Sequence, residues 1–61
     1  TDVQYWDMVG YVGRERRKQA ERIISTPAFK TRPDDVKIRL LKSAYERGAE
    51  IGKRAFIKEK L

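Results

Sequence analysis

The chain has two long stretches of helical hydrophobic spacing, separated by a short segment that contains Pro27 and ends just before Pro33. From residue 33 onward, apolar or small side chains recur every three or four positions, which is the period of one helix face. That face consists of Val36, Leu40, Leu41, Ala44, Tyr45, Gly48, Gly52, Ala55 and Phe56. The pattern predicts one amphipathic helix over residues 33–61, with a buried stripe and a charged opposite side.

The first stretch has no proline before residue 27 and carries apolar or small residues at similar intervals. We predict a helix over residues 1–24, opened by a capping box in which Thr1 and Gln4 satisfy early amide groups. Gly10 and Gly13 each cost about 1 kcal/mol relative to alanine in a helix interior. We therefore expect either that the helix begins after these glycines or that a neighbour lies close to them.

Residues 25–32 form the predicted linker. Pro27 and Pro33 interrupt the helical pattern, because proline lacks an amide hydrogen and disfavours helical geometry in the residue before it. Thr26 is predicted to cap one short helical turn that starts at Pro27. Thr31 with Asp34 resembles a second capping pair. The carboxylates of Asp34 and Asp35 suit the positive end of the last helix.

Three tiny residues of the second helix, Ala44, Gly48 and Gly52, are spaced four apart and share one face. The spacing predicts that another backbone lies close to this face, without saying whether the helices form a hairpin or stay splayed. A chain of 61 residues buries only about 60% of the surface that it exposes when unfolded. With no cysteine to cross-link it, we expect a partner or an oligomer to complete the fold.

The charge is strongly positive, with 15 Lys and Arg against 9 Asp and Glu, a net charge of +6. Two clusters carry much of the excess: Arg14, Arg16, Arg17, Lys18 and Arg22, and then Lys53, Arg54, Lys58 and Lys60. The first cluster points in several directions on a helix, which favours a solvated surface. Contact with nucleic acid is the alternative.

The residues offer little for catalysis or for metal binding. The chain has no His and no Cys, so the usual nitrogen and sulfur ligands of metals are missing. Gly10 and Gly13 lack the strand and the Lys-Ser/Thr pair of a phosphate-binding loop. No apolar run approaches the length of a membrane span. Tyr5, Trp6 and Tyr11 are interpreted as packing anchors against a partner, with base stacking as the alternative.

Part of the chain resembles a family of bacteriophage proteins. The resemblance covers about residues 20–57 and rests on Arg22-Ile23-Ile24-Ser25-Thr26-Pro27-Ala28-Phe29, Pro33-Asp34-Asp35-Val36-Lys37, Leu40-Leu41, Ala44-Tyr45 and Gly48-Ala49. These segments are similar to helices near the C-termini of very large internal virion, ejection and tape-measure-like proteins of tailed phages. The resemblance implies an assembly segment that contacts other head or portal-proximal proteins, with packaged DNA nearby.

We therefore predict an all-α fold of two long helices joined by a Pro-bounded turn, with no enzymatic activity and no cofactor. The predicted function is protein–protein interaction within a phage virion component, located in the virion or otherwise in the host cytoplasm. The alternatives are a small basic nucleic-acid-binding protein and a regulatory peptide. Thr1 leaves open whether the chain continues beyond residues 1–61.

Two sets of residues carry these predictions. The predicted partner interface is Trp6, Val9, Ile23, Ile24, Phe29, Leu41, Ala44, Tyr45, Gly48, Gly52 and Phe56. The predicted nucleic-acid contacts, in the alternative function, are Arg14, Arg16, Arg17, Lys18 and Arg22.

Overall fold

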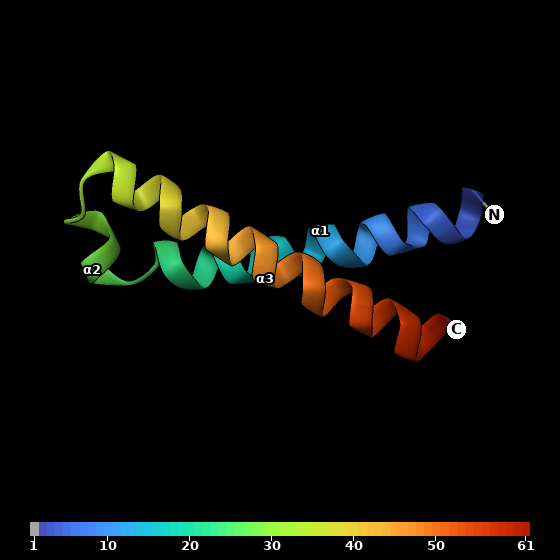
Figure 1. Cartoon of the computed structure of the whole chain (residues 1–61). Helices are drawn as coiled ribbons and strands as arrows, with labels where there is room; N and C mark the ends of the chain where they lie inside the picture. Colours follow the sequence, from blue (N-terminus) through green and yellow to red (C-terminus); the bar gives the residue numbers. More distant parts are fainter. Residues whose placement is uncertain (1) are drawn as a thin grey trace.

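Three helices follow one another along the chain in a computed structural model that describes residues 2–61. Helix α1 spans Asp2–Ile24, the single turn α2 spans Pro27–Lys30, and α3 spans Asp34–Lys60. The two long helices run antiparallel, with α2 at the closed end and both chain ends at the open end (Figure 1). The predicted all-α fold is confirmed, and its long helices form a hairpin.

The helix boundaries lie within one residue of the predicted ones. Pro33 sits just outside α3 in an extended conformation (φ −62°, ψ 158°), as expected of a residue that cannot continue a hydrogen-bonded turn. Asp34 and Asp35 occupy the first turn of α3, where the helix dipole favours negative charge. The predicted capping box depends on Thr1, which lies outside the described residues.

The hydroxyl groups of the linker do not cap the following helices, so the predicted capping pair of Thr31 with Asp34 is wrong, whereas the predicted N-cap position of Thr26 is confirmed. Thr26 occupies the N-cap position of α2, but its hydroxyl donates to the carbonyl of Ile23 at 2.8 Å. The Thr31 hydroxyl donates to Ala28 at 2.9 Å, and Pro33 takes the N-cap position of α3. A helix leaves its last carbonyl groups without partners, and these hydroxyls satisfy such carbonyls on the preceding turn.

The prediction that a backbone lies close to the small residues of α3 is confirmed, and that backbone belongs to α1. A Cβ atom built on Gly48 would lie 2.5 Å from the Arg16 Cα, and one on Gly52 would lie 2.6 Å from the Val12 Cα. Such distances are far below van der Waals contact. Only glycine fits at these two positions, where the helices cross.

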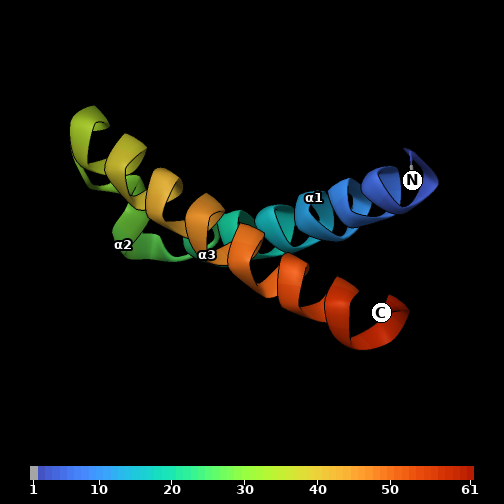
Figure 2. The same ribbon diagram turned by 45° about the vertical axis from the view of Figure 1, so that its right-hand side comes forward.

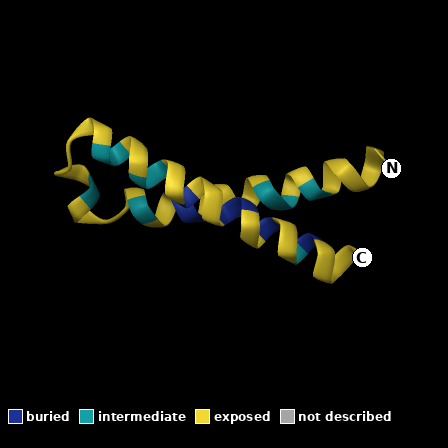
Figure 3. Cartoon of the chain, in the orientation of Figure 1, coloured by how far each residue is buried: buried dark blue, intermediate teal, exposed yellow. Residues whose placement is uncertain are grey.

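A narrow buried seam runs along the middle of the hairpin (Figure 3). It consists of Gln19 and Ala20 from α1 and of Ala44, Gly48, Ala49, Gly52 and Phe56 from α3. Most of these side chains are small, so the helices touch mainly through backbone and Cβ atoms. Such a seam holds two helices together without forming a layered core.

The glycines of α1 contradict both explanations that the sequence suggested for them. Helix α1 passes through Gly10 and Gly13 without interruption. A Cβ atom built on either glycine would meet nothing within 4 Å. Within the hairpin, neither position requires glycine.

The molecule is long and thin, measuring 43 × 16 × 12 Å, with a radius of gyration of 13.7 Å. A compact chain of this length would have a radius of gyration of about 10.5 Å. Figures 1 and 2 both show the first turns of α1 and the last turns of α3 diverging toward the chain ends. Large apolar side chains near this open end are exposed, among them Val3 and Trp6 of α1 and Ile57 of α3.

Candidate protein interaction surface

A group of large apolar side chains lies exposed on the first turns of α1. Val3 is 72% exposed and Trp6 is 67% exposed, and Tyr5 and Val9 are exposed as well. We call these residues, Val3, Tyr5, Trp6 and Val9, the α1 apolar patch. The rings of Tyr5 and Trp6 meet edge to face at 5.4 Å and 78°. Such a group at one end of an ordered helix is typical of a protein contact.

The divergence of the helices explains why part of this patch is uncovered. Tyr5 and Val9 continue the row of Val12 and Arg16, since positions three and four apart share one helix face. Val12 and Arg16 meet the glycines of α3 at the crossing. The first turns of α1 and the last turns of α3 diverge (Figure 2), and Tyr5 is 56% exposed. The row that is covered at the crossing is therefore open near the start of α1.

The residues of the predicted partner interface fall into three groups in the structure. Ala44, Gly48, Gly52 and Phe56 are buried in the α1–α3 seam. Ile23, Phe29 and Leu41 are half-buried, and Trp6, Val9, Ile24 and Tyr45 are exposed. The small residues of α3 are thus occupied within the hairpin. The exposed group is what a partner can reach.

The exposed members of the predicted interface lie in two separate places. Ile24 and Tyr45, from different helices, line one groove beside the seam, together with Gly13, Arg16, Arg17, Ala20 and Glu21. Trp6 and Val9 lie near the open end, within the α1 apolar patch. Val3 and Tyr5 complete that patch but are missing from the predicted set. Their three- and four-residue spacing from Trp6 and Val9 was the signal that could have included them.

Beyond the crossing, toward the open end, Tyr11 of α1 contacts Phe56 and Glu59 of α3. The Tyr11 hydroxyl of α1 donates a hydrogen bond to the Glu59 carboxylate of α3 at 2.5 Å. The Tyr11 ring meets the Phe56 ring edge to face, with 5.8 Å between centroids, and the Arg14 guanidinium lies 5.5 Å from the Tyr11 ring centre. The hydrogen bond to Glu59 raises the pKa of Tyr11 above its ordinary value of 10.0, since it stabilises the neutral phenol.

The basic cluster of α1 is divided between different sides of the helix. Arg14, Lys18 and Arg22 are spaced four apart and form one row. Lys18 in that row pairs with Glu15 at 3.4 Å. Arg16 and Arg17 lie instead beside the groove of Ile24 and Tyr45. The five cations therefore lie on several sides of α1, as the sequence predicted for a helix.

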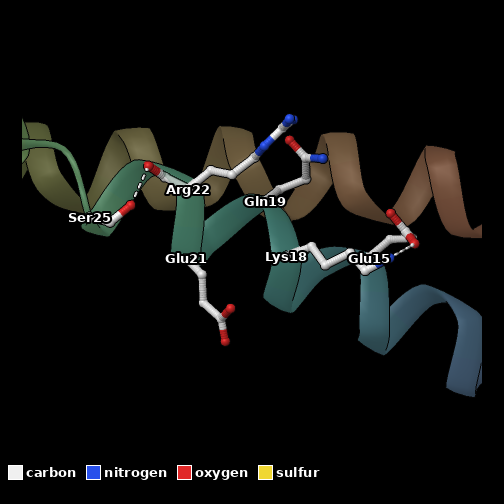
Figure 4. Close-up of a pocket in the computed structure, with 6 residues that line it drawn as sticks. All are labelled: Glu15, Lys18, Gln19, Glu21, Arg22 and Ser25. Atoms are coloured by element: carbon white, nitrogen blue, oxygen red, sulfur yellow. Dashed lines mark hydrogen bonds and ion pairs between the residues drawn. The ribbon is translucent and has the colours of Figure 1, made fainter.

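Acidic side chains also interrupt the basic surface. A polar depression near the closed end is lined by Glu15, Lys18, Gln19, Glu21, Arg22 and Ser25. Figure 4 shows Gln19 and Arg22 extending to one side of α1, whereas Glu21 extends to the opposite side. The Ser25 hydroxyl donates to the Arg22 carbonyl at 3.1 Å. The depression therefore combines both signs of charge.

Comparison with protein-family models, with curated proteins and with solved structures finds no match to this chain. Across residues 2–61, the side chains do not assemble a group of acidic residues that could hold a metal ion. Neither long helix, over the same residues, combines the length and apolar character needed to cross a membrane.

Proposed function

We propose that this chain is a non-enzymatic interaction module that joins protein subunits in a larger assembly. The observation that carries the proposal is the α1 apolar patch, in which Trp6 and its neighbours are exposed on an ordered helix. Burying large aromatic side chains supplies much of the binding energy at protein interfaces. A hairpin with a seam of small residues gains little stability from its own core, so association also supports the fold.

The assembly that we propose is a tailed-phage particle, in which the chain belongs to an internal, ejection or portal-proximal head protein. This part of the proposal rests on the resemblance of residues 20–57 to helical segments of such proteins. The net charge of +6 suits a position near packaged DNA, because cationic surfaces are attracted to polyanions. Outside the particle, the expected location is the host cytoplasm.

Site-specific photo-crosslinking tests this proposal. A photoreactive benzoylphenylalanine replaces Trp6 in one variant and Glu46, an exposed residue of α3, in a control variant. Both are irradiated inside assembled particles and analysed by mass spectrometry. We expect the probe at position 6 to form protein adducts and the probe at position 46 to form few. Equal labelling at both positions, or absence of the chain from purified particles, would contradict the proposal.

Nucleic-acid binding is the second candidate, and the row of Arg14, Lys18 and Arg22 is the observation in its favour. Three phosphate contacts correspond to a slope of about −2.7 in a plot of log affinity against log salt concentration. Replacing all three residues with glutamine is expected to flatten the slope by that amount if DNA binds here. The matched control is Arg17→Gln, on a different side of α1. If Arg17→Gln flattened the salt slope as much as the triple replacement does, the row would be ruled out as the binding site.

A further inference from the structure

The free hairpin exposes more surface than its size requires. Its solvent-accessible surface is 4986 Å², whereas a compact monomer of 7.2 kDa is expected to expose about 4,100 Å². The excess is roughly 850 Å², close to the about 800 Å² that each partner contributes to a standard protein interface. The surface left uncovered is thus enough for one stable contact.

The outward side of α1 is exposed along the helix and carries Val3 and Trp6, both large and apolar, near its start. Several residues of α1 that turn toward α3 are buried or half-buried, among them Met8, Val12 and Gln19. At about 100° per residue, six residues fall within an arc of about 60° on the opposite side: Val3, Trp6, Gly10, Arg17, Glu21 and Ile24. All six are exposed, and we call the first four, Val3, Trp6, Gly10 and Arg17, the outer face of α1.

The charges along α1 suit an antiparallel copy of the same helix. Residues 2–13 carry the carboxylates of Asp2 and Asp7 and no cation. Residues 14–24 carry five cations, Arg14, Arg16, Arg17, Lys18 and Arg22, and two carboxylates. One end is therefore negative and the other positive, so two α1 helices attract when they run in opposite directions and repel when they run in parallel.

The same count explains how a chain with a charge of +6 approaches another copy of itself. Helix α1 has a net charge of only +1, from five cations and four carboxylates. The remaining +5 of the +6 total lies on the linker and α3. Contact through the outer face of α1 therefore brings the least charged parts of two copies together and keeps the more basic helices apart.

We propose that the outer face of α1 binds a second copy of this chain, with the two α1 helices antiparallel about a two-fold axis near Gly10. In this arrangement Asp7 of each copy lies beside Arg14 of the other, and each Trp6 is covered by the opposite helix. A two-fold contact repeats every interaction twice. The inference rests on the proposed function, of which it names the partner.

The test uses sedimentation equilibrium over a wide concentration range, with the emission of Trp6 as a second readout. The chain has a single Trp, so its emission reports directly on burial of the outer face. We expect a dimer and a blue shift of emission with rising concentration. Trp6→Ala is expected to raise the dissociation constant roughly 30-fold. Trp6 is exposed and its one described ring partner is Tyr5, so circular dichroism should show an intact hairpin.

Reversing the charge of Asp7 or of Arg14 tests whether the two α1 helices are antiparallel. Asp7→Arg alone and Arg14→Glu alone are each expected to weaken the dimer roughly tenfold or more, because each places like charges together twice. The double variant restores both pairs and is expected to dimerise like the unmodified chain. A dimer that the double variant does not restore would overturn the antiparallel arrangement.

A monomer at every concentration would overturn the proposal as a whole. The crosslinking experiment then separates this failure from failure of the proposed function. Adducts between position 6 and a different protein would leave the interaction function standing with another partner. Absence of any protein adduct would remove both proposals.

Discussion

Gly48 and Gly52 differ from Gly10 and Gly13 in what lies beyond the Cα atom, although all four are helical. Beyond Gly48 and Gly52 is the backbone of α1, and beyond Gly10 and Gly13 is open space. Glycine in α3 thus allows the close crossing, whereas glycine in α1 only lowers the stability of that helix. Substitution by alanine separates these two effects.

Gly48→Ala is expected to lower the free energy of unfolding by about 1–3 kcal/mol, because its Cβ would force the Arg16 backbone to move. Gly13→Ala, the matched control, adds the same methyl group where nothing lies within 4 Å. It is expected to raise the free energy of unfolding by up to about 1 kcal/mol. Urea denaturation of both variants, followed by circular dichroism at low protein concentration, measures the difference. Equal effects of the two substitutions would contradict the close crossing.

Tyr11 is expected to titrate above 10.0 because its hydroxyl donates to the Glu59 carboxylate. Glu59→Gln removes the negative acceptor and is expected to bring the pKa of Tyr11 down toward 10.0. Glu46→Gln, on the same helix and without a contact to Tyr11, is the control. NMR titration of the ring carbons resolves Tyr11 from Tyr5 and Tyr45. An unchanged pKa in Glu59→Gln would show that another group causes the shift.

The raised pKa of Tyr11 also fixes the sign of its contribution to stability. The neutral phenol is favoured in the folded chain, so the contribution is fully present below pH 10, the ordinary value for tyrosine. It is lost as the pH rises through the higher folded-state pKa, when the phenolate faces a carboxylate. The contact between Tyr11 and Glu59 is therefore expected to be lost at strongly alkaline pH and to be kept at neutral pH.

At the scale of the helices, the hydrophobic period and the two prolines were enough to predict α1, α2 and α3 almost to the residue. Proline acts through local geometry, so its effect can be predicted without knowledge of the tertiary structure. The four-residue spacing of Ala44, Gly48 and Gly52 also predicted a close neighbour correctly. It did not identify α1 as that neighbour, because spacing describes one helix and not the partner that packs on it.

Contacts that join distant residues could not be predicted in this way. Tyr11 and Glu59 are 48 positions apart and meet because the crossing sets how far the helices extend past each other. The linker hydroxyls were predicted wrongly for a different reason. Thr26 and Thr31 can serve either the helix before them or the helix after them, and the sequence pattern does not distinguish these options.

Phe56 is the largest buried side chain of α3 and is 5% exposed, whereas the next residue, Ile57, is 56% exposed. Phe56→Ala is expected to lower the free energy of unfolding by about 3 kcal/mol, through lost apolar burial and the ring contact with Tyr11. Ile57→Ala is expected to change it by less than about 0.5 kcal/mol. Thermal unfolding followed by circular dichroism compares the two variants. A larger effect for Ile57→Ala would place the seam on the other side of α3.

At the scale of the whole molecule, the hairpin combines a closed end, a close crossing and an open end. The sequence predicted that the fold would need support from outside, since so short a chain without cysteine has a small core. It did not predict which face is left uncovered. That face depends on where α3 diverges from α1, and thus on the register of two helices whose sequences are far apart.

The equal spacing of Ala44, Gly48 and Gly52 has a consequence for that register. If α3 slid along α1 by one helical turn, about 5.4 Å, Ala44 and Gly48 would take the places of Gly48 and Gly52. That second alignment would put the Ala44 methyl group at the place where a Cβ built on Gly48 lies 2.5 Å from the Arg16 Cα, so the close crossing disfavours it. The linker opposes it as well, because its prolines and its hydroxyl bonds to Arg22, Ile23 and Ala28 fix the distance between the helix ends. The short turn and the two glycines thus set the alignment of the long helices together, and with a longer linker the glycines alone would hold it.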